Sequence, residues 1–187
     1  MTLLALMRHA ETAWSAEKRI QGRAEIPILA GASIRLPDAC NGMRIVTSPL
    51  VRCVQTAALL GAPDALREPR LSEMHWGEWE GETLPGLRAR LGAEMAANEA
   101  RGLDFTPPGG ESPRMVIRRL KDWLLEVART GRPTLAITHR GVIRAILAEA
   151  TGWDMVRKPP AKLDWSAVHF FQVDYHGKPG VHRLNVR

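Results

Sequence analysis

Short apolar runs alternate along this chain with longer stretches in which apolar residues recur at helical spacing. Five runs are typical of β-strands: Leu3–Met7, Arg44–Thr47, Thr134–Thr138, Ser166–Val173 and a last one near Val181–Val186. Three stretches between them predict helices: Pro49–Leu60, Ser112–Arg129 and Gly141–Ala150. The turn residues at 174–180 lie between the last two strands and predict a C-terminal hairpin.

Capping residues mark the ends of these helices. Ser48 and Ser112 each precede a proline, and a serine cap followed by proline in the first turn is a favoured helix start. Gly131 and Gly152 stand where two helices should end. The long second helix has one apolar side, which consists of Met115, Val116, Leu120, Trp123, Leu124 and Val127.

Strands that alternate with helices predict an α/β fold. We expect a three-layer α/β/α sandwich with a mostly parallel central sheet and helices on both faces. The 187 residues fit one domain, residues 1–187. Arg101–Gly110 has two prolines and two adjacent glycines, so it predicts a loop, placed either to line a site or to link two elements.

Composition narrows the class of protein. No apolar run approaches the roughly 20 residues of a membrane span, and the first residues lack the pattern of a signal peptide. Cys40 and Cys53 form no CxxC motif and are expected to be small core residues, so a cytoplasmic protein without membrane contact is the expectation. The oligomeric state is not indicated by the sequence.

The net charge of +6 favours an anionic partner. Lysines and arginines are spread along the chain and are not interleaved with aromatic residues, which argues against nucleic acid. A small phosphorylated metabolite explains the charge, and so does surface solubility.

Two histidines follow predicted strands directly. Arg8 and His9 come after Leu3–Met7, and His139 comes after Thr134–Thr138. The ends of strands in an open α/β sheet are the usual place for ligand chemistry. Arginine holds phosphate through two parallel N–H groups, and histidine is a nucleophile near neutral pH. A single such histidine is more often structural, whereas two in the same context favour a phosphate site.

Three further segments could contribute. Arg52 lies in the first turn of a helix, where the dipole favours anions, although a solvated arginine is the alternative. Leu71–Gly81 contains three glutamates and two tryptophans, and indole neighbours would raise the pKa of a glutamate enough to hold a proton. The alternative is a packed loop with its glutamates outside, which we expect for Glu78, Glu80 and Glu82. Pro107–Ser112 is glycine-rich and could present N–H groups to an anion, but it does not match the nucleotide P-loop.

These segments together resemble the histidine phosphatase superfamily, which includes cofactor-dependent phosphoglycerate mutases and alpha-ribazole phosphatases. The similarity runs from about Leu3 to Leu147. Its most specific parts are Arg8-His9-x-Glu-Thr, Ser48-Pro-Leu-x-Arg-x-x-x-Thr-Ala and Thr138-His-x-Gly-Val-Ile-Arg. The stretches Glu73-x-x-x-Gly-x-Trp-Glu-Gly, Pro108-Gly-Gly-Glu-Ser and Arg19-Ile-Gln-Gly-Arg also match. The resemblance implies a phosphoglycerate mutase-like fold.

The resemblance also implies roles. His9 would take the phosphoryl group, and Glu73 would protonate the leaving oxygen and then activate water. Arg8, Arg52 and His139 would hold the phosphate oxygens, while the cations near His9 keep its ring nitrogen unprotonated. Further phosphate- or substrate-binding candidates are Ser15, Gln21, Gly22 and Arg140. The histidine spacing fits no zinc motif, so neither a metal nor another cofactor is expected.

The chain departs from the family pattern at four places. Ala10 stands where glycine is usual, Ser15 where asparagine is usual, and Arg140 where a second glycine is common. The stretch Gly31–Arg44 is shorter than usual, so we expect a helix there to be trimmed. No catalytic group is lost, but the substrate is left open.

The expected function is a metal-independent phosphomonoesterase acting on a small phosphate ester. A phosphoglycerate mutase-type phosphotransferase is the alternative, disfavoured because mutases of the family carry extra segments over the site. A non-catalytic binder of phosphorylated ligands is a second alternative. Candidates for the substrate side, each equally explained as solvated or packed, are Arg88, Arg90, Arg101 and Trp76. No catalytic role is expected for His75, His169, His176 and His182.

Overall fold

A six-stranded sheet forms the centre of the molecule, in a computed structural model that describes residues 1–187. The strands are β1 (Thr2–Arg8), β2 (Arg44–Thr47), β3 (Leu66–Arg67), β4 (Thr134–Thr138), β5 (Val168–Val173) and β6 (Pro179–Val186). Their order is β3-β2-β4-β1-β5-β6. The first four in this order are parallel, whereas β5 runs antiparallel to β1 and to β6. The predicted mostly parallel sheet and C-terminal hairpin are confirmed.

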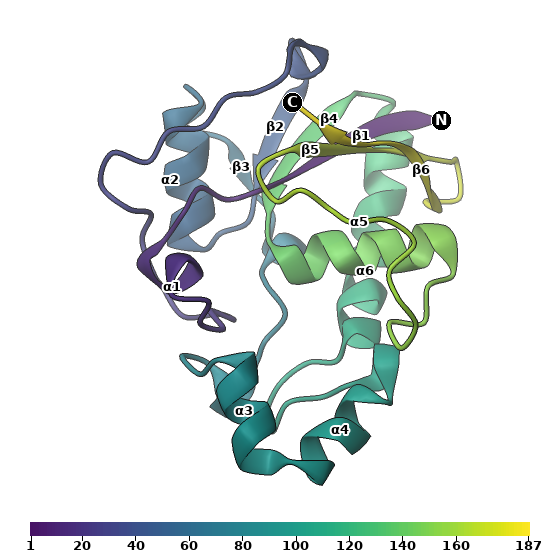
Figure 1. The fold of residues 1–187 in the computed structure, drawn as a ribbon. Coiled ribbons are helices and arrows are strands. Elements are labelled where there is room, and N and C mark those ends of the chain that lie inside the picture. Colours follow the sequence, from purple (N-terminus) through teal and green to yellow (C-terminus); the bar gives the residue numbers. More distant parts are fainter.

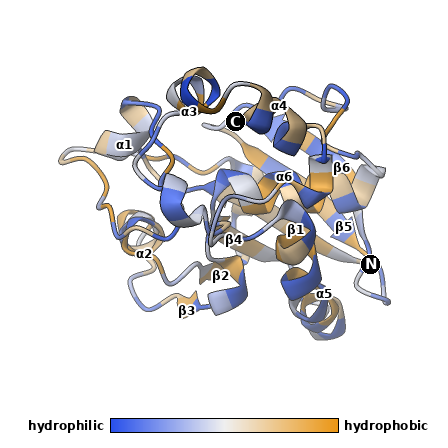
Figure 2. Cartoon of the chain, turned by 90° about the horizontal axis from the view of Figure 1, so that it is seen from below, coloured by the Kyte–Doolittle hydropathy of each residue, from blue (hydrophilic) through white to orange (hydrophobic).

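Helices cover both faces of this sheet (Figure 1). The helices of the chain are α1 (Ala13–Ala16), α2 (Val51–Leu59), α3 (Leu84–Leu91), α4 (Ala93–Glu99), α5 (Pro113–Thr130) and α6 (Arg140–Thr151), of which α2 covers one face and α5 and α6 cover the other. Successive side chains of β1 point to opposite faces, so Leu4 and Leu6 join the core under α5 and α6, while Ala5 and Met7 join the core under α2. Figure 2 shows the apolar residues gathered in the strands and on the inner sides of these helices. The three-layer sandwich is confirmed.

Helix α5 illustrates how local pattern and capping agree. Ser112 caps it through its side chain, which accepts a hydrogen bond from the Met115 N–H, and Gly131 ends it in the left-handed conformation. Ile117 belongs to the buried side, whereas Met115 is 46% exposed, so the prediction for Met115 was wrong. Position 115 lies at the edge of the apolar side of the helix, next to the side that faces solvent.

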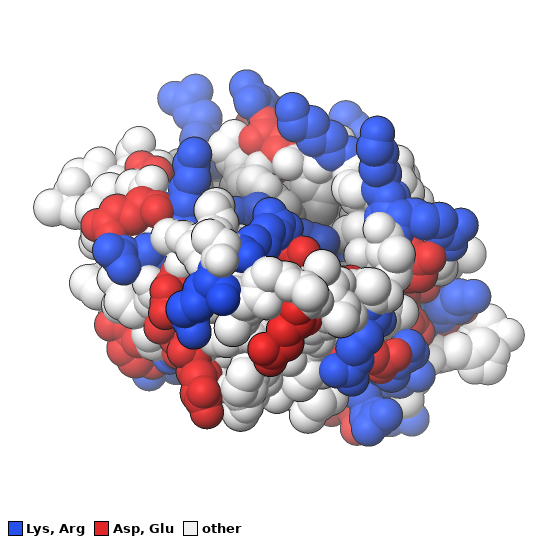
Figure 3. Space-filling view, turned by 60° about the horizontal axis from the view of Figure 1, so that its bottom comes forward, with Lys and Arg blue, Asp and Glu red and all other residues white.

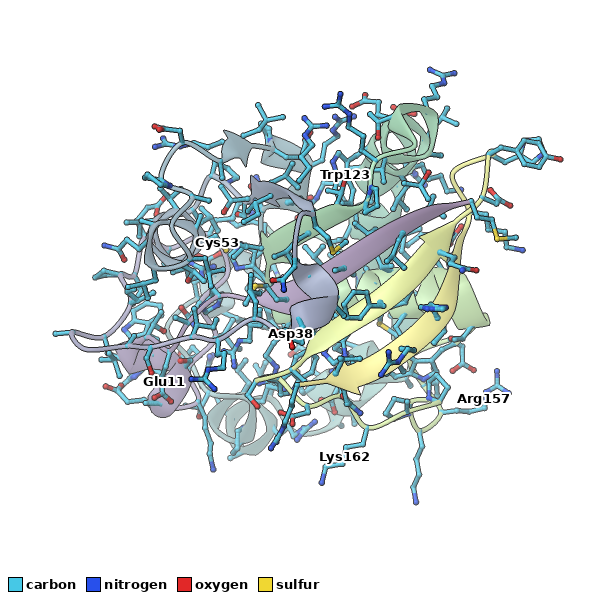
Figure 4. All side chains as sticks on the ribbon, turned by 90° about the horizontal axis from the view of Figure 1, so that it is seen from above. Glu11, Asp38, Cys53, Trp123, Arg157 and Lys162 are labelled. Carbon is cyan, nitrogen blue, oxygen red and sulfur yellow. The ribbon has the colours of Figure 1, made fainter.

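Helix α2 begins differently from the prediction. Its cap is Leu50, with Pro49 outside the helix, and Ser48 is turned toward the sheet edge. Glu25 instead accepts the hydrogen bond of the Val51 N–H at 2.8 Å, so a distant loop satisfies this helix start. Between Gly31 and Arg44 the chain forms one 3₁₀ turn, Asp38–Cys40, as expected for a trimmed segment. Cys40 and Cys53 are buried, and Figure 4 shows Cys53 between α2 and the sheet.

The sequence did not predict β3, α3 or α4. Strand β3 has two residues, and the two helices each bury one apolar side chain, Leu87 or Met95, which leaves too little periodicity to detect. Thr83, followed by proline two residues later, caps α3 and was the available signal. These helices extend below the sheet in Figure 1 around a small separate cluster of Ile20, Trp79, Leu87 and Met95.

The predicted loop Arg101–Gly110 contains one 3₁₀ turn, Gly102–Asp104. Its Phe105 packs on Trp76 and Trp79 with ring centroids 5.5 and 5.9 Å apart. The loop therefore joins the α3–α4 region to the main body. None of the helices combines the length and the apolar character that a bilayer crossing requires.

Candidate active site

The register of two parallel strands brings the two histidines together. Arg8 pairs with Thr138 across β1 and β4, so His9 and His139 are the next residues on neighbouring strands. The His9 N–H donates to the Thr138 carbonyl at 3.0 Å, one step beyond the ladder. The ring centroids are 5.3 Å apart and the rings are inclined by 56°. The predicted convergence at one sheet edge is confirmed.

His9 presents one free ring nitrogen. Its Nδ1 lies 2.7 Å from the Ala10 carbonyl oxygen, and because a carbonyl only accepts, Nδ1 carries the proton. The lone pair is then on Nε2. The side chain is 7% exposed, and burial, with Arg8 and then Arg52 nearby, lowers the pKa of His9 well below its usual value. His9 is therefore a neutral imidazole with a nucleophilic Nε2.

Both ring nitrogens of His139 bond within the protein. Arg52 Nε donates to Nδ1 at 3.3 Å, so Nε2 carries the proton and faces Ser48 Oγ at 2.8 Å. The Cys53 sulfur lies 3.4 Å from the same Nε2. Burial, followed by Arg52, lowers the pKa of His139 well below its usual value. His139 therefore orients Arg52, and its contact with phosphate stays a prediction.

Arg52 is fully buried and held by the loop before it. Nη1 and Nη2 each donate to a carbonyl at 2.7 Å, those of Ala24 and Gly22. Three of the five guanidinium N–H groups are thus used inside the protein, which leaves two for a ligand. Gly22 has φ +49°, and a Cβ there would overlap the carboxylate of Glu80. A solvated helix arginine is excluded.

Arg8 has a buried hydrogen-bond donor that has no acceptor in the protein. Its Nε is buried and has no partner in the protein, and the guanidinium forms no ion pair. Burial, with a contribution from Arg140, lowers the pKa of Arg8 to about 10. Buried donors in folded proteins almost always have an acceptor, so the Arg8 Nε–H is available to an oxygen atom of a ligand. An anionic oxygen would satisfy it.

Glu73 is held at the start of α6. Its Oε1 accepts from the Met74 N–H at 2.8 Å and its Oε2 from the Gly141 N–H at 3.2 Å. Trp76 and Trp79 pack on Phe105, and the indole surroundings of Glu73 stay a prediction. A helix N-terminus, with its exposed N–H groups, favours such a carboxylate. Because Gly141 lies two residues after His139, this hydrogen bond holds the Glu73 carboxylate near His139.

Sequence reasoning missed Arg119, which positions this segment. Arg119 projects from α5, and its Nη2 donates to the carbonyls of Ser72 at 2.7 Å and Glu73 at 3.3 Å. Its Nε pairs with Glu111 at 3.1 Å. A charged residue among the apolar positions of an amphipathic helix was the only available signal.

Two N–H groups of the glycine-rich segment have acceptors within the protein. Gly110 N–H donates to the Pro107 carbonyl, and Glu111 N–H donates to the His75 carbonyl, so these groups are already used. Glu80 also departs from the prediction, because its Oε1 accepts from the Arg23 and Trp76 N–H groups. Both features tie loops together below the site. No three His, Cys, Asp or Glu side chains gather as a metal-binding group.

Some of the remaining candidates for binding phosphate or substrate already bond within the protein, and others keep groups without a protein partner. Ser15 Oγ donates to the Thr12 carbonyl and accepts from the Thr12 N–H, in a capping box in which Thr12 caps α1, so its predicted contact with phosphate is not supported. Gln21 Oε1 accepts from Thr12 Oγ1 at 3.0 Å, and its NH₂ group has no protein partner. The Arg140 guanidinium lies over the Trp165 ring. Seen from the side of α1 and α3, the surface is hollowed and Lys and Arg atoms gather around the hollow (Figure 3).

Two of the substrate-side candidates are already paired. Arg88 binds Glu99 at 2.8 Å and Arg90 binds Glu82 at 3.2 Å, which ties both to the α3–α4 region. Trp76 packs on Phe105. The geometry therefore favours the packed or solvated alternative for these residues.

Comparison with known proteins agrees with this geometry. A profile of the histidine phosphatase superfamily (branch 1) matches residues 4–187. The chain belongs to the histidine phosphatase superfamily.

Similar members of the superfamily have different named activities. The chain is 29% identical over 166 residues to 2,3-bisphosphoglycerate-dependent phosphoglycerate mutase 2 of Gloeobacter violaceus, covering 80% of this chain and 75% of the mutase. It is 31% identical over 171 residues to a metal-independent phosphoserine phosphatase of Arabidopsis thaliana, covering 81% and 69%. The solved structure of YhfR from Bacillus stearothermophilus superposes with a TM-score of 0.82 at 26% identity, covering 100% and 98%. Both phosphatases and mutases are therefore among its relatives.

A first prediction concerns the position of the Glu73 carboxylate. A Cβ on Gly141 would overlap the Glu73 carboxylate, so Gly141→Ala should displace it and lower kcat for a phosphate ester about 100-fold. Alanine favours a helix by about 1 kcal/mol over glycine, so the folded chain should not lose stability from propensity. Steady-state kinetics and thermal unfolding measure both effects. Gly86→Ala, in α3, is the matched control, and full activity of Gly141→Ala would show that the carboxylate works from another position.

A second prediction concerns acid stability. A histidine whose pKa is lower in the folded chain than in the unfolded chain takes up a proton on unfolding, so acid favours the unfolded chain. The pKa values of His9 and His139 are lowered in the folded protein, so each histidine should lower the free energy of unfolding at pH 5.5 by about 1.4 kcal/mol relative to its value well above pH 6.5. Buried His169, whose pKa is lowered by burial, should add to the loss.

Urea unfolding at pH 7.5 and pH 5.5 measures this change in the free energy of unfolding. His9→Gln should remove about 1.4 kcal/mol of this pH-dependent change, the part that comes from His9. Equal stability of the parent protein at both pH values would contradict the buried neutral state of these rings.

Proposed function

We propose that this protein is a phosphomonoesterase that hydrolyses a small phosphate ester through a phosphohistidine on His9. The observation that carries the proposal is the free Nε2 of a buried, neutral His9 beside Arg8, whose Nε has no partner. A nucleophile and unsatisfied cationic donors together match what phosphoryl transfer requires. The similarity to a relative named metal-independent phosphoserine phosphatase supports the same reaction class.

In the first step His9 Nε2 attacks phosphorus. The N–P bond forms as the bond from phosphorus to the ester oxygen breaks, and the leaving oxygen takes a proton from Glu73. Arg8 and the two free N–H groups of Arg52 stabilise the charge on the phosphoryl oxygens. His139 holds Arg52 for this task and lies beside the phosphoryl group as a second imidazole.

In the second step water replaces the alcohol. The Glu73 carboxylate takes a proton from water, the water oxygen bonds to phosphorus, and the N–P bond breaks to restore neutral His9. Inorganic phosphate then leaves, and Glu73 again carries the proton that it gave up in the first step. No metal ion is needed, because the arginines supply the positive charge that a cation would otherwise provide.

Transfer to a second hydroxyl is the competing function. The relative named 2,3-bisphosphoglycerate-dependent phosphoglycerate mutase 2 favours it, since a mutase can use the same phosphohistidine. Phosphoryl exchange between 3-phosphoglycerate and its bisphosphate would reveal this activity. A protein that binds phosphate ligands tightly without turnover would instead be a non-catalytic binder.

A third prediction tests the proposed function directly. The protein should hydrolyse p-nitrophenyl phosphate equally with and without a chelator, and His9→Ala should abolish turnover. Arg52→Ala should lower kcat/KM by about 10³-fold or more, with circular dichroism confirming the fold. Rapid quenching into alkali should trap phosphate on the parent protein and not on His9→Ala. Turnover retained by His9→Ala would rule out this nucleophile.

A fourth prediction tests Glu73 as the proton donor. Poor leaving groups need protonation, whereas p-nitrophenolate leaves without it. Glu73→Gln should therefore lose far more activity on an alkyl phosphate than on p-nitrophenyl phosphate. Arg52→Ala is the contrast, since it should weaken both substrates to a similar degree. Equal losses in Glu73→Gln would show that another group donates the proton.

A further inference from the structure

The loop around Arg23 holds one half of the proposed catalytic machinery. The carbonyl groups of Gly22 and Ala24 each accept a hydrogen bond from Arg52 at 2.7 Å. Arg23 lies between these two residues, and Arg52 itself is fully buried. The position of the Arg52 guanidinium therefore follows that of the loop, and a shift of the loop would move the cation that the proposed function places against phosphate.

The residues after Glu73 are held by two glutamates. The His75 N–H donates to Glu111 Oε2 at 3.0 Å, and the Glu111 N–H donates back to the His75 carbonyl at 2.8 Å. The Trp76 N–H donates to Glu80 Oε1 at 3.2 Å. The backbone two and three residues beyond the proposed proton donor is therefore fixed by two carboxylates.

The same two carboxylates also bind Arg23. Glu80 Oε1 accepts from the Arg23 backbone N–H at 2.9 Å, and Glu111 Oε2 lies 3.2 Å from Arg23 Nη2. Glu111 has a further partner, because Arg119 Nε lies 3.1 Å from its Oε1. The Arg119 guanidinium also donates to the Glu73 carbonyl at 3.3 Å. Glu111 thus contacts both the loop that holds Arg52 and the arginine that holds the Glu73 segment.

The surroundings of Glu111 suit a charged carboxylate in a fixed position. Its side chain is 14% exposed, so water competes little for its oxygens. Burial would raise the pKa of Glu111, but the His75 N–H and two arginines outweigh burial and keep this pKa below its usual value. An ionised carboxylate accepts several hydrogen bonds at once. A neutral amide could still accept from His75, but its NH₂ group would face the guanidinium donors.

We infer that Glu111 is a positioning residue that couples the two halves of the site. Through Arg23 it fixes the loop that holds Arg52. Through Arg119 it fixes the segment that carries Glu73. This inference rests on the proposed function, in which the arginine stabilises the phosphoryl oxygens while the glutamate protonates the leaving oxygen. Both groups act in one transition state, where a displacement of about 1 Å can cost about 100-fold in rate.

The experiment compares p-nitrophenyl phosphate with phenyl phosphate, two substrates of similar shape. The nitro group stabilises the leaving phenolate, so the ratio of the two kcat/KM values, p-nitrophenyl over phenyl, rises when proton donation fails. A smaller folded fraction lowers both values equally and leaves this leaving-group ratio unchanged. Glu111→Gln should lower kcat/KM for p-nitrophenyl phosphate about tenfold and raise the leaving-group ratio about fivefold or more.

Variants of the two arginines separate the halves. Arg23→Met should raise KM for both substrates about fivefold, because it displaces the phosphate-binding cation, and should leave the leaving-group ratio unchanged. Arg119→Met should instead raise the leaving-group ratio. Arg23 belongs to a half-exposed ion pair, which contributes little to stability, so Arg23→Met keeps the test open if Glu111→Gln unfolds. A parental ratio in folded Glu111→Gln would overturn the coupling, and so would a parental KM in Arg23→Met.

A matched variant controls for the loss of a paired glutamate. Glu99 of α4 pairs with Arg88 of α3 at 2.8 Å and binds neither half of the site. Glu99→Gln should therefore keep the parental kcat/KM and the parental leaving-group ratio. Thermal unfolding of all variants reports the folded fraction. A rise of the ratio in Glu99→Gln equal to that in Glu111→Gln would overturn the specific role of Glu111.

The outcomes separate this inference from the proposed function. Turnover that Glu111→Gln leaves at the parental level overturns the inference and leaves the phosphatase standing. Absence of all turnover by the parent protein overturns the phosphatase. Calorimetric titration of inorganic phosphate into His9→Ala then tests the coupling to the phosphate side without catalysis. Adding Glu111→Gln to His9→Ala should weaken phosphate binding several-fold, whereas adding Glu99→Gln should not, and equal affinities overturn the inference.

Discussion

The parallel pairing of β1 with β4 is the constraint on which the site depends. Because Arg8 pairs with Thr138, the chain leaves both strands at the same level, and the His9 N–H still reaches the Thr138 carbonyl. Strand β2 ends alongside, so Ser48 meets His139 from the other side. A slip of one residue would turn one imidazole to the opposite face of the sheet. The buried apolar alternation of β1 and β4, packed under helices on both faces, opposes such a slip.

Concentrated positive charge is the main energetic cost of this arrangement. Arg52 is fully buried, and burial lowers the pKa values of Arg8, Arg52, Arg140 and Arg144. Carbonyl oxygens of the Gly22–Ala24 loop and the neutral His139 satisfy Arg52 without neutralising it. A carboxylate partner would stabilise the free protein better, but it would also compete with phosphate. The site thus keeps its cations hydrogen-bonded and uncompensated, which is the preorganisation that an anionic substrate requires.

Loops distant in sequence complete the site by hydrogen bonds rather than by apolar packing. Arg119 and Glu111 secure the segment that carries Glu73, and Glu25 caps the helix that carries Arg52. Glu80 fastens the turn at Gly22 and Arg23. These carboxylates and guanidinium groups resemble solvated surface residues in the sequence. Their partners lie far along the chain, so no local pattern reveals them.

The sequence by itself determined the alternation of strands and helices, the caps of α5, and the placement of His9 and His139 after apolar strands. These features depend on contacts within a few residues and on periodicity, which any single chain displays. Only the tertiary structure decided what each polar side chain bonds to. Ser48 bonds to His139 and not to a helix start, Glu73 accepts from the Met74 and Gly141 N–H groups, and Arg140 lies over Trp165. The physical reason is that a hydrogen bond requires a particular distance and direction between two groups. Such geometry exists only once remote segments have packed.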